Sequence, residues 1–293
     1  MMRFWGKLLA ASFGMAALVA AAQFGVVYGL NALRLDREFL SGADNEWNLQ
    51  LTWAAWFAAL AVLAGATYAA SLAVAQSGRS RVGAGVRAVG GIGATLGAAA
   101  ASVPLTLQPA RLARVNASFD PELTAAIAVG AGLVAGLLVT LLVVARKPLS
   151  TNLWVCTGGV WLLAAASFVD SAQFGRNRDA LAEYYDPMRL GVLDLSALEP
   201  IPRATFSMPV LALLTALVCG LVARHQGRSR LWIALSGAIG PLLVAMAYVI
   251  GGPGVSRALT DQADAYLGAM IAVVVGLAVS SIIALAPRRP GVL

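Results

Sequence analysis

The chain has 293 residues and a net charge of +7, and 59% of its residues are hydrophobic while only 12% are charged. A soluble domain usually carries about 25% charged residues, and the mean hydropathy here is +0.78. This composition excludes a soluble enzyme, a disordered protein and a disulfide scaffold. It predicts an all-α integral membrane protein whose main partner is the lipid bilayer. Basic and aromatic residues do not cluster together, so we expect no nucleic-acid partner.

Eight apolar runs are long enough to cross a bilayer, which requires about 20 residues in a helix. In chain order they cover 8–30, 52–75, 88–108, 123–145, 153–174, 206–223, 231–250 and 265–286. The first run begins with basic residues, as a signal peptide does, but its apolar stretch is longer than is usual for one. The third run is rich in glycine and weakly apolar, which suits the interior of a bundle. Without it the number of spans would be seven.

The charges between the runs predict the orientation of the chain in the membrane. If the N-terminus is cytoplasmic, the cytoplasmic segments hold 12 of the 21 basic residues and none of the 14 acidic ones. Both chain ends are then cytoplasmic, and the longer acidic connections at 31–51 and 175–205 lie outside. We therefore predict a multi-pass protein of the bacterial cell (plasma) membrane.

The chain resembles itself at an interval of about 150 residues. The sequence Ala-Gln-Phe-Gly at 22–25 recurs at 172–175, and Arg-Ser-Arg at 79–81 recurs at 228–230. Four spans in each unit would bring both units into the membrane from the same side. We therefore predict two parallel four-helix repeats, related by a pseudo-two-fold axis along the membrane normal. These units are residues 1–150 and 151–293.

Ionisable groups within membrane spans usually indicate a functional site. The spans of this chain contain few polar residues that are candidates for one. Asp170 lies near the outer end of the fifth span, where it could contact a cation or substrate, or pair with Arg176 or Arg178. Gln23 and Gln173 occupy equivalent positions in the two units. They could line a polar path, but holding helices in register is the favoured role. Together with Asp170 they are the predicted binding residues.

A basic cluster is predicted on the cytoplasmic side, next to the membrane. It would attract anionic lipid headgroups, although orientation of the chain during insertion explains the same charges. Its members are Arg79, Arg81, Arg228 and Arg230.

The first outer connection contains two carboxylates, Asp36 and Glu38. Their spacing resembles the acidic pair in the first outer loop of lipid-linked glycosyltransferases, where one carboxylate can act as a base on the acceptor. The chain lacks the large outer domain that is usual in those enzymes. An ion pair with Arg34 or Arg37 is the simpler interpretation.

The outer connection 175–205 is the longest aqueous segment and has no counterpart of equal length in the first unit. It could bind a membrane-protein partner or cover the bundle as a lid. Within it, Asn177 begins a predicted short helix that ends at Asp186. The two cysteines, Cys156 and Cys219, lie singly in apolar runs, so we predict no metal and no cofactor.

Three functions remain open from the sequence. A non-enzymatic structural or interaction component is favoured, because no midplane charge, nucleotide motif or catalytic signature is present. The alternative is a transporter or permease for a small, weakly polar or lipidic solute. The third is a lipid-linked transferase that uses Asp36 or Glu38. A structure with an interior tightly packed with small residues would favour the structural or interaction component. A polar cavity that reaches past mid-membrane would favour the transporter. An outer cleft that holds Asp36 or Glu38 beside a lipid-sized groove would favour the transferase.

Overall fold

The structure is a computed structural model that describes residues 2–39, 44–77, 82–115, 119–173, 188–195, 203–252 and 260–287. Within these residues it has eight long helices and two short strands. The helices are α1 (Met2–Gly29), α2 (Asp44–Ser77), α3 (Ala84–Ala110), α4 (Pro121–Val143), α5 (Lys147–Gln173), α6 (Arg203–His225), α7 (Arg230–Gly251) and α8 (Thr260–Leu285). The strands are β1 (Glu38–Phe39) and β2 (Arg114–Val115), which pair in parallel.

Each of the eight helices is long and apolar enough to cross a membrane. The predicted spans are therefore confirmed as helices, and the protein is a multi-pass membrane protein. The glycine-rich third span is among them, as α3. Several of its glycines lie against α1. A side chain at these positions would prevent the close approach of the two helices.

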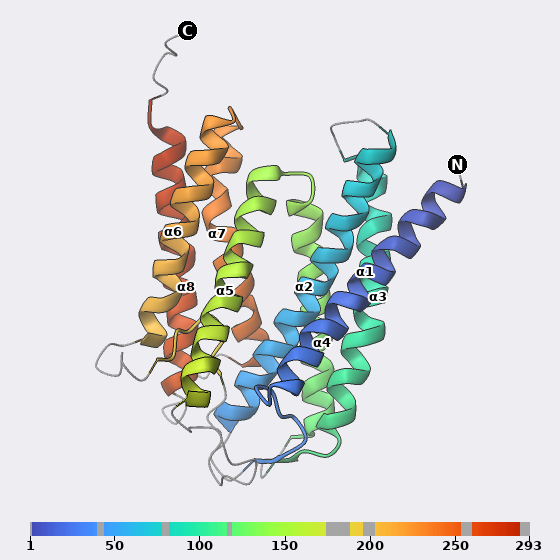
Figure 1. Ribbon diagram of the computed structural model, residues 1–293, viewed down its shortest axis with the longest axis vertical. Helices are drawn as coiled ribbons and strands as arrows, with labels where there is room; N and C mark the ends of the chain where they lie inside the picture. The colour runs from blue at the N-terminus through green and yellow to red at the C-terminus, as the bar shows by residue number, and fades with distance from the viewer. Residues whose placement is uncertain are drawn as a thin grey trace.

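The helix α2 forms the centre of the bundle (Figure 1). It packs against α1, α3 and α4 on one side and against α7 on the other. Every residue from 49 to 66 is buried, so other parts of the protein cover α2 on all sides along this stretch.

Small residues set the distances between neighbouring helices. In the first unit, Gly132 and Gly136 of α4 lie against Ala55 and Ala59 of α2. A Cβ atom at Gly136 would lie 2.7 Å from the Cα atom of Ala59, and one at Gly132 would overlap the backbone of Ala55. The backbones of α2 and α4 therefore touch directly, as is typical of membrane helices that associate by van der Waals packing.

A second close contact joins α7 and α8. Gly237 and Gly276 face each other, and a Cβ atom on either would overlap the carbonyl group of the other. Ser280 lies beside them, and its Oγ accepts a hydrogen bond from the Gly237 N–H at 3.3 Å. The same Oγ lies 2.5 Å from the carbonyl oxygen of Ala234. This hydroxyl adds a polar link to an interface made of backbone contacts.

The two halves of the chain meet where α2 packs against α7 (Figure 1). At this contact a Cβ atom on Gly251 would lie 2.7 Å from both the carbonyl oxygen of Asn48 and the amide nitrogen of Thr52. A two-fold axis that carries α1–α4 onto α5–α8 would also pack α6 against α3. Within the described residues these two helices form no contact of comparable extent. The contact between the halves therefore joins the second helix of one half to the third helix of the other, and the pseudo-two-fold axis stays a prediction.

Charged residues separate to the two ends of the bundle. α1 begins and α8 ends at the same end (Figure 1). The described side chains at that end include no acidic residue, and we call it the basic end. Its described basic residues are Arg3, Lys7, Arg87, Arg146, Lys147, Arg224, Arg228 and Arg230. The described acidic residues lie toward the other end, which we call the acidic end.

The segment 188–195 folds back into the acidic end of the bundle. Leu190 and Val192 are buried in the main core, and the hydroxyl of Tyr248 donates a hydrogen bond to the carbonyl oxygen of Leu190 at 2.8 Å. Gly191 has φ +74°, a conformation that favours glycine. This part of the predicted outer connection therefore covers the bundle. The helix predicted from Asn177 lies outside the described residues.

Candidate functional site

The structure places Gln23 between two helices of the first unit. The side chain is 8% exposed, and its Nε2 atom donates to the carbonyl oxygen of Val19 at 3.2 Å and, across the helix contact, to that of Phe57 at 3.4 Å. The amide therefore links α1 to α2. The side chain of Gln173 lies outside the described residues, so a pairing of Gln23 with Gln173 stays a prediction.

Asp170 lies on the last turns of α5, at the acidic end, where its side chain is half-buried and engaged in an interaction. It does not line either of the two cavities described below for this end of the bundle.

An open groove at the acidic end contains Asp36. Its volume is about 470 Å³. The Asp36 carboxylate is held by Arg34, whose Nε atom lies 3.1 Å from Oδ1, as the simpler interpretation of the sequence predicted. Arg34 also donates to Asn31 Oδ1 at 2.8 Å. The hydroxyl of Tyr28, which also lines the groove, donates to the carbonyl oxygen of Leu105 at 2.8 Å, which joins α1 to α3. The side chains of Asp36, Asn31 and Arg34 are thus bound to one another, and that of Tyr28 to the backbone.

Glu38 does not share this groove. It lies in β1, opposite Arg114 of β2, and its neighbour Arg37 pairs with Glu46 at 3.6 Å. The structure therefore separates the two carboxylates that the sequence placed together. At the nearby start of α4, the Glu122 carboxylate accepts a hydrogen bond from Arg111 at 2.8 Å. This bond raises the pKa of the Arg111 guanidinium.

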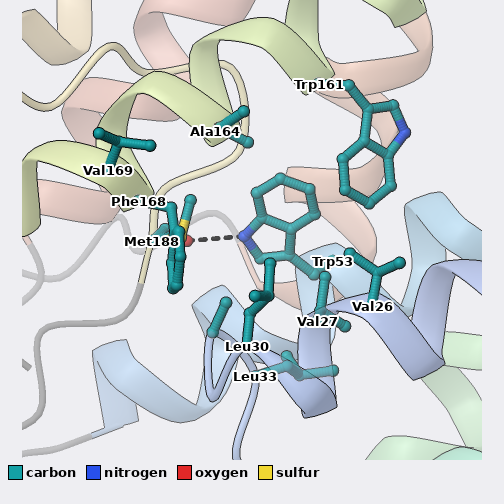
Figure 2. Close-up of a pocket in the computed structure, with 12 residues that line it drawn as sticks. Val26, Val27, Leu30, Leu33, Trp53, Trp161, Ala164, Phe168, Val169 and Met188 are labelled. Carbon is teal, nitrogen blue, oxygen red and sulfur yellow. Dashed lines mark hydrogen bonds between the residues drawn. The ribbon is translucent and has the colours of Figure 1, made fainter. Parts of the chain in front are cut away.

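A cavity lies between helices of the two halves of the chain (Figure 2). Its volume is about 170 Å³, and all of its lining side chains are hydrocarbon, aromatic or thioether groups. An apolar cavity of roughly 150 Å³ takes up benzene, so this one has room for a hydrocarbon group of similar size. We call it the apolar pocket. It is lined by Val26, Val27, Leu30, Ala32, Leu33, Trp53, Trp161, Ala164, Ala165, Phe168, Val169 and Met188.

Aromatic side chains from both halves form one wall of the apolar pocket. Trp161 of α5 lies parallel to Phe57 of α2, with ring centroids 5.6 Å apart, and 6.2 Å from Trp53. The indole N–H of Trp53 donates to the carbonyl oxygen of Met188 at 2.6 Å (Figure 2). Its one polar atom is therefore satisfied inside the protein, and the ring offers only an apolar face to the pocket.

The lining of the apolar pocket reaches the surface of the protein. Val26 and Val169 on its rim are about half exposed, and both lie on apolar helices. The arrangement can hold a hydrocarbon group by dispersion and burial alone. Its described lining contains no group that could act as an acid, a base or a nucleophile. Sequence reasoning missed this site, because Trp53 and Trp161 are 108 positions apart and read singly as core residues.

Several arginines at the basic end hold helix ends together. Arg87 donates to the carbonyl oxygen of Leu141 in the last turn of α4 at 3.1 Å, and Arg224 donates to that of Ile283 in the last turn of α8 at 3.0 Å. Both satisfy carbonyl groups that a helix end leaves without a partner. Arg146 lies over the ring of Trp232, 4.3 Å from its centroid.

Of the predicted basic cluster, Arg79 and Arg81 lie outside the described residues. Arg228 and Arg230 lie at the basic end, between α6 and α7 and at the start of α7. Within the described part of the chain, no three His, Cys, Asp or Glu side chains are grouped so that they could hold a metal ion.

Comparisons of this chain with models of protein families, with curated protein sequences and with solved structures found no match.

Proposed function

We propose that this protein is a non-enzymatic structural or interaction component of the cell membrane, built as a closely packed bundle. The observation that carries the proposal is the contact between the halves. There α2 is buried on every side from residue 49 to 66, and Gly251 brings the backbone of α7 against α2. A transporter that alternates between two open states would have to separate these surfaces and expose them to water.

Cysteine accessibility tests this proposal without knowledge of any solute. In a background with Cys156→Ala and Cys219→Ala, single cysteines are introduced at Val62 in α2 and at Ala247 in α7, which are 0% and 2% exposed. We expect neither to react with a water-soluble maleimide in native membranes, because water does not reach them. Gln226→Cys, at an exposed position of the basic end, is the control that should react.

All three variants should react after denaturation, which shows that the thiols are intact. Labelling of the folded protein at Val62→Cys or Ala247→Cys would contradict the proposal and favour a permease.

A second candidate function, the handling of a lipidic solute, is favoured by the apolar pocket. The pocket lies between the halves and its lining reaches the surface of the protein, so a hydrocarbon chain could enter it from within the bilayer. Phospholipids with brominated chains quench tryptophan on contact, and Trp53 and Trp161 line the pocket. We expect such lipids to quench the wild-type protein more strongly than Ala165→Phe, which fills the pocket from an exposed position of its lining.

Ala21→Phe is the matched control, since Ala21 is an exposed alanine of α1 that does not line the pocket. It should be quenched like the wild type. Equal quenching of Ala165→Phe and the wild type would show that no lipid chain occupies the pocket, and the second candidate would then be rejected. The transferase hypothesis has less support than either candidate, because Asp36 is paired with Arg34 and Glu38 lies elsewhere.

We further propose that residues 1–150 and 151–293 are parallel repeats with the N-terminal side of the bundle in the cytoplasm. Support comes from the helix neighbours within each half. The first helix of each half packs against the second and third, the second packs against the third and fourth, and the third packs against the fourth. Charge supports the orientation, since the basic end would face the cytoplasm.

A further inference from the structure

Another cavity lies at the basic end, between the beginning of α5 and the end of α6. Its volume is about 330 Å³. We call it the basic pocket. Its lining is divided between polar and apolar groups and, among the residues that the structure describes, includes no Asp or Glu. The lining residues are Lys147, Pro148, Thr151, Cys219, Val222, Ala223, Gln226 and Arg228.

The polar side of the basic pocket is suited to an anion. Lys147 and Arg228 bring two positive charges, and Thr151 and Gln226 bring a hydroxyl and an amide. Because Lys147 and Pro148 are the first residues of α5, the positive end of that helix dipole also lies at the pocket. Arg228 Nε lies 3.4 Å from Gln226 Oε1, so the guanidinium is held on the same side as the amide.

Lys147 differs from the arginines of this end that join helix ends. Arg87 and Arg224 bind backbone carbonyl groups of α4 and α8, so their charges have a structural use. Lys147 is exposed, and it forms no hydrogen bond or ion pair with any residue that the structure describes. Its ammonium group is thus available to a ligand.

The apolar side of the basic pocket identifies the kind of anion. Val222 lines the pocket and is about half exposed, on the same helix as Val218 and Leu221, which are equally exposed. This side of α6 faces lipid, so the pocket lies where the aqueous boundary meets the hydrocarbon region. We propose that the basic pocket binds the phosphate group of an anionic phospholipid, whose acyl chains lie along Val222 and the lipid-facing side of α6.

The test uses the full chain in detergent, titrated with phosphatidylglycerol, with phosphatidylcholine or with inorganic phosphate. Native mass spectrometry counts bound lipid, and the thermal unfolding midpoint reports stabilisation. We expect phosphatidylglycerol to bind at least about tenfold more tightly than phosphatidylcholine, since each basic residue near a membrane attracts anionic lipid by about 1 kcal/mol. Inorganic phosphate should give no shift. Equal binding of the two lipids, or an equal shift with phosphate alone, would overturn the proposal.

Two variants locate the site. The double variant Lys147→Gln with Arg228→Gln should weaken phosphatidylglycerol binding at least about tenfold. Arg3→Gln with Lys7→Gln removes the same charge from the same end outside the pocket, and should change binding by less than about twofold. Thr151→Trp fills the pocket from an exposed position and keeps both charges, so it decides the result if the double variant does not fold. Loss with the control pair, or binding retained by Thr151→Trp, would overturn the assignment.

Discussion

Two glycines on α4 have opposite surroundings, which shows how single positions determine the packing. A Cβ atom at Gly136 would lie 2.7 Å from the backbone of Ala59, whereas one at Gly130 would meet nothing within 4 Å. We expect Gly136→Leu to lower the free energy of unfolding by about 1–3 kcal/mol, because the backbones of α2 and α4 would be forced apart. Gly130→Leu should be neutral or stabilising. Thermal unfolding in detergent measures both variants, and an equal loss at the two positions would disprove the packing argument.

At the scale of the element, the segment 188–195 is held by hydrogen bonds to helix side chains. The Ser167 Oγ atom accepts from the Asp194 N–H at 2.8 Å. Arg189 and Asp194 pair at 2.8 Å, with both side chains less than 20% exposed. Ser167→Ala leaves the Asp194 N–H without its acceptor, which costs about 1–3 kcal/mol where the group is buried. We therefore expect trypsin to cleave after Arg189 several times faster in this variant, as followed by mass spectrometry.

Ser71→Ala provides the comparison for that experiment. Ser71 also forms a hydrogen bond within its own helix, to the carbonyl oxygen of Tyr68 at 2.7 Å, but it is exposed and far along α2 from the segment. Cleavage after Arg189 at the wild-type rate in Ser167→Ala would show that this hydroxyl does not hold the segment.

The helices could be predicted from the sequence because bilayer thickness fixes the length of an apolar run. Their ends were less predictable. α2 begins at Asp44, two turns before the apolar run at 52, because polar residues continue the helix beyond the hydrocarbon region. The ion pair of Arg34 with Asp36 could also be predicted, since the partners are two residues apart. The pairing of β1 with β2 could not be predicted, since two-residue strands in separate connections carry no periodic signal.

At the scale of the whole molecule, the two halves of the chain do not meet through equivalent helices. The buried centre of the first unit is α2, whereas α6, the second helix of the other unit, has Val210, Leu214 and Val218 more than half exposed. The same place in the chain order is therefore central in one unit and peripheral in the other. A sequence repeat predicts a similar fold for each unit, but the residues on the faces decide which faces meet. That is why the apolar pocket, which depends on this contact, could not be foreseen.

The distribution of charge over the whole bundle predicts its orientation in the cell. All described basic residues of the basic end lie together without an acidic neighbour, and such an end is retained in the cytoplasm during insertion. In the background Cys156→Ala, Cys219→Ala, we expect Leu112→Cys at the acidic end, where Leu112 is 68% exposed, to react with a membrane-impermeant maleimide in intact cells. Gln226→Cys at the basic end should react only after the membrane is permeabilised. The reverse pattern of labelling would show that the bundle has the opposite orientation, with the basic pocket in the outer leaflet.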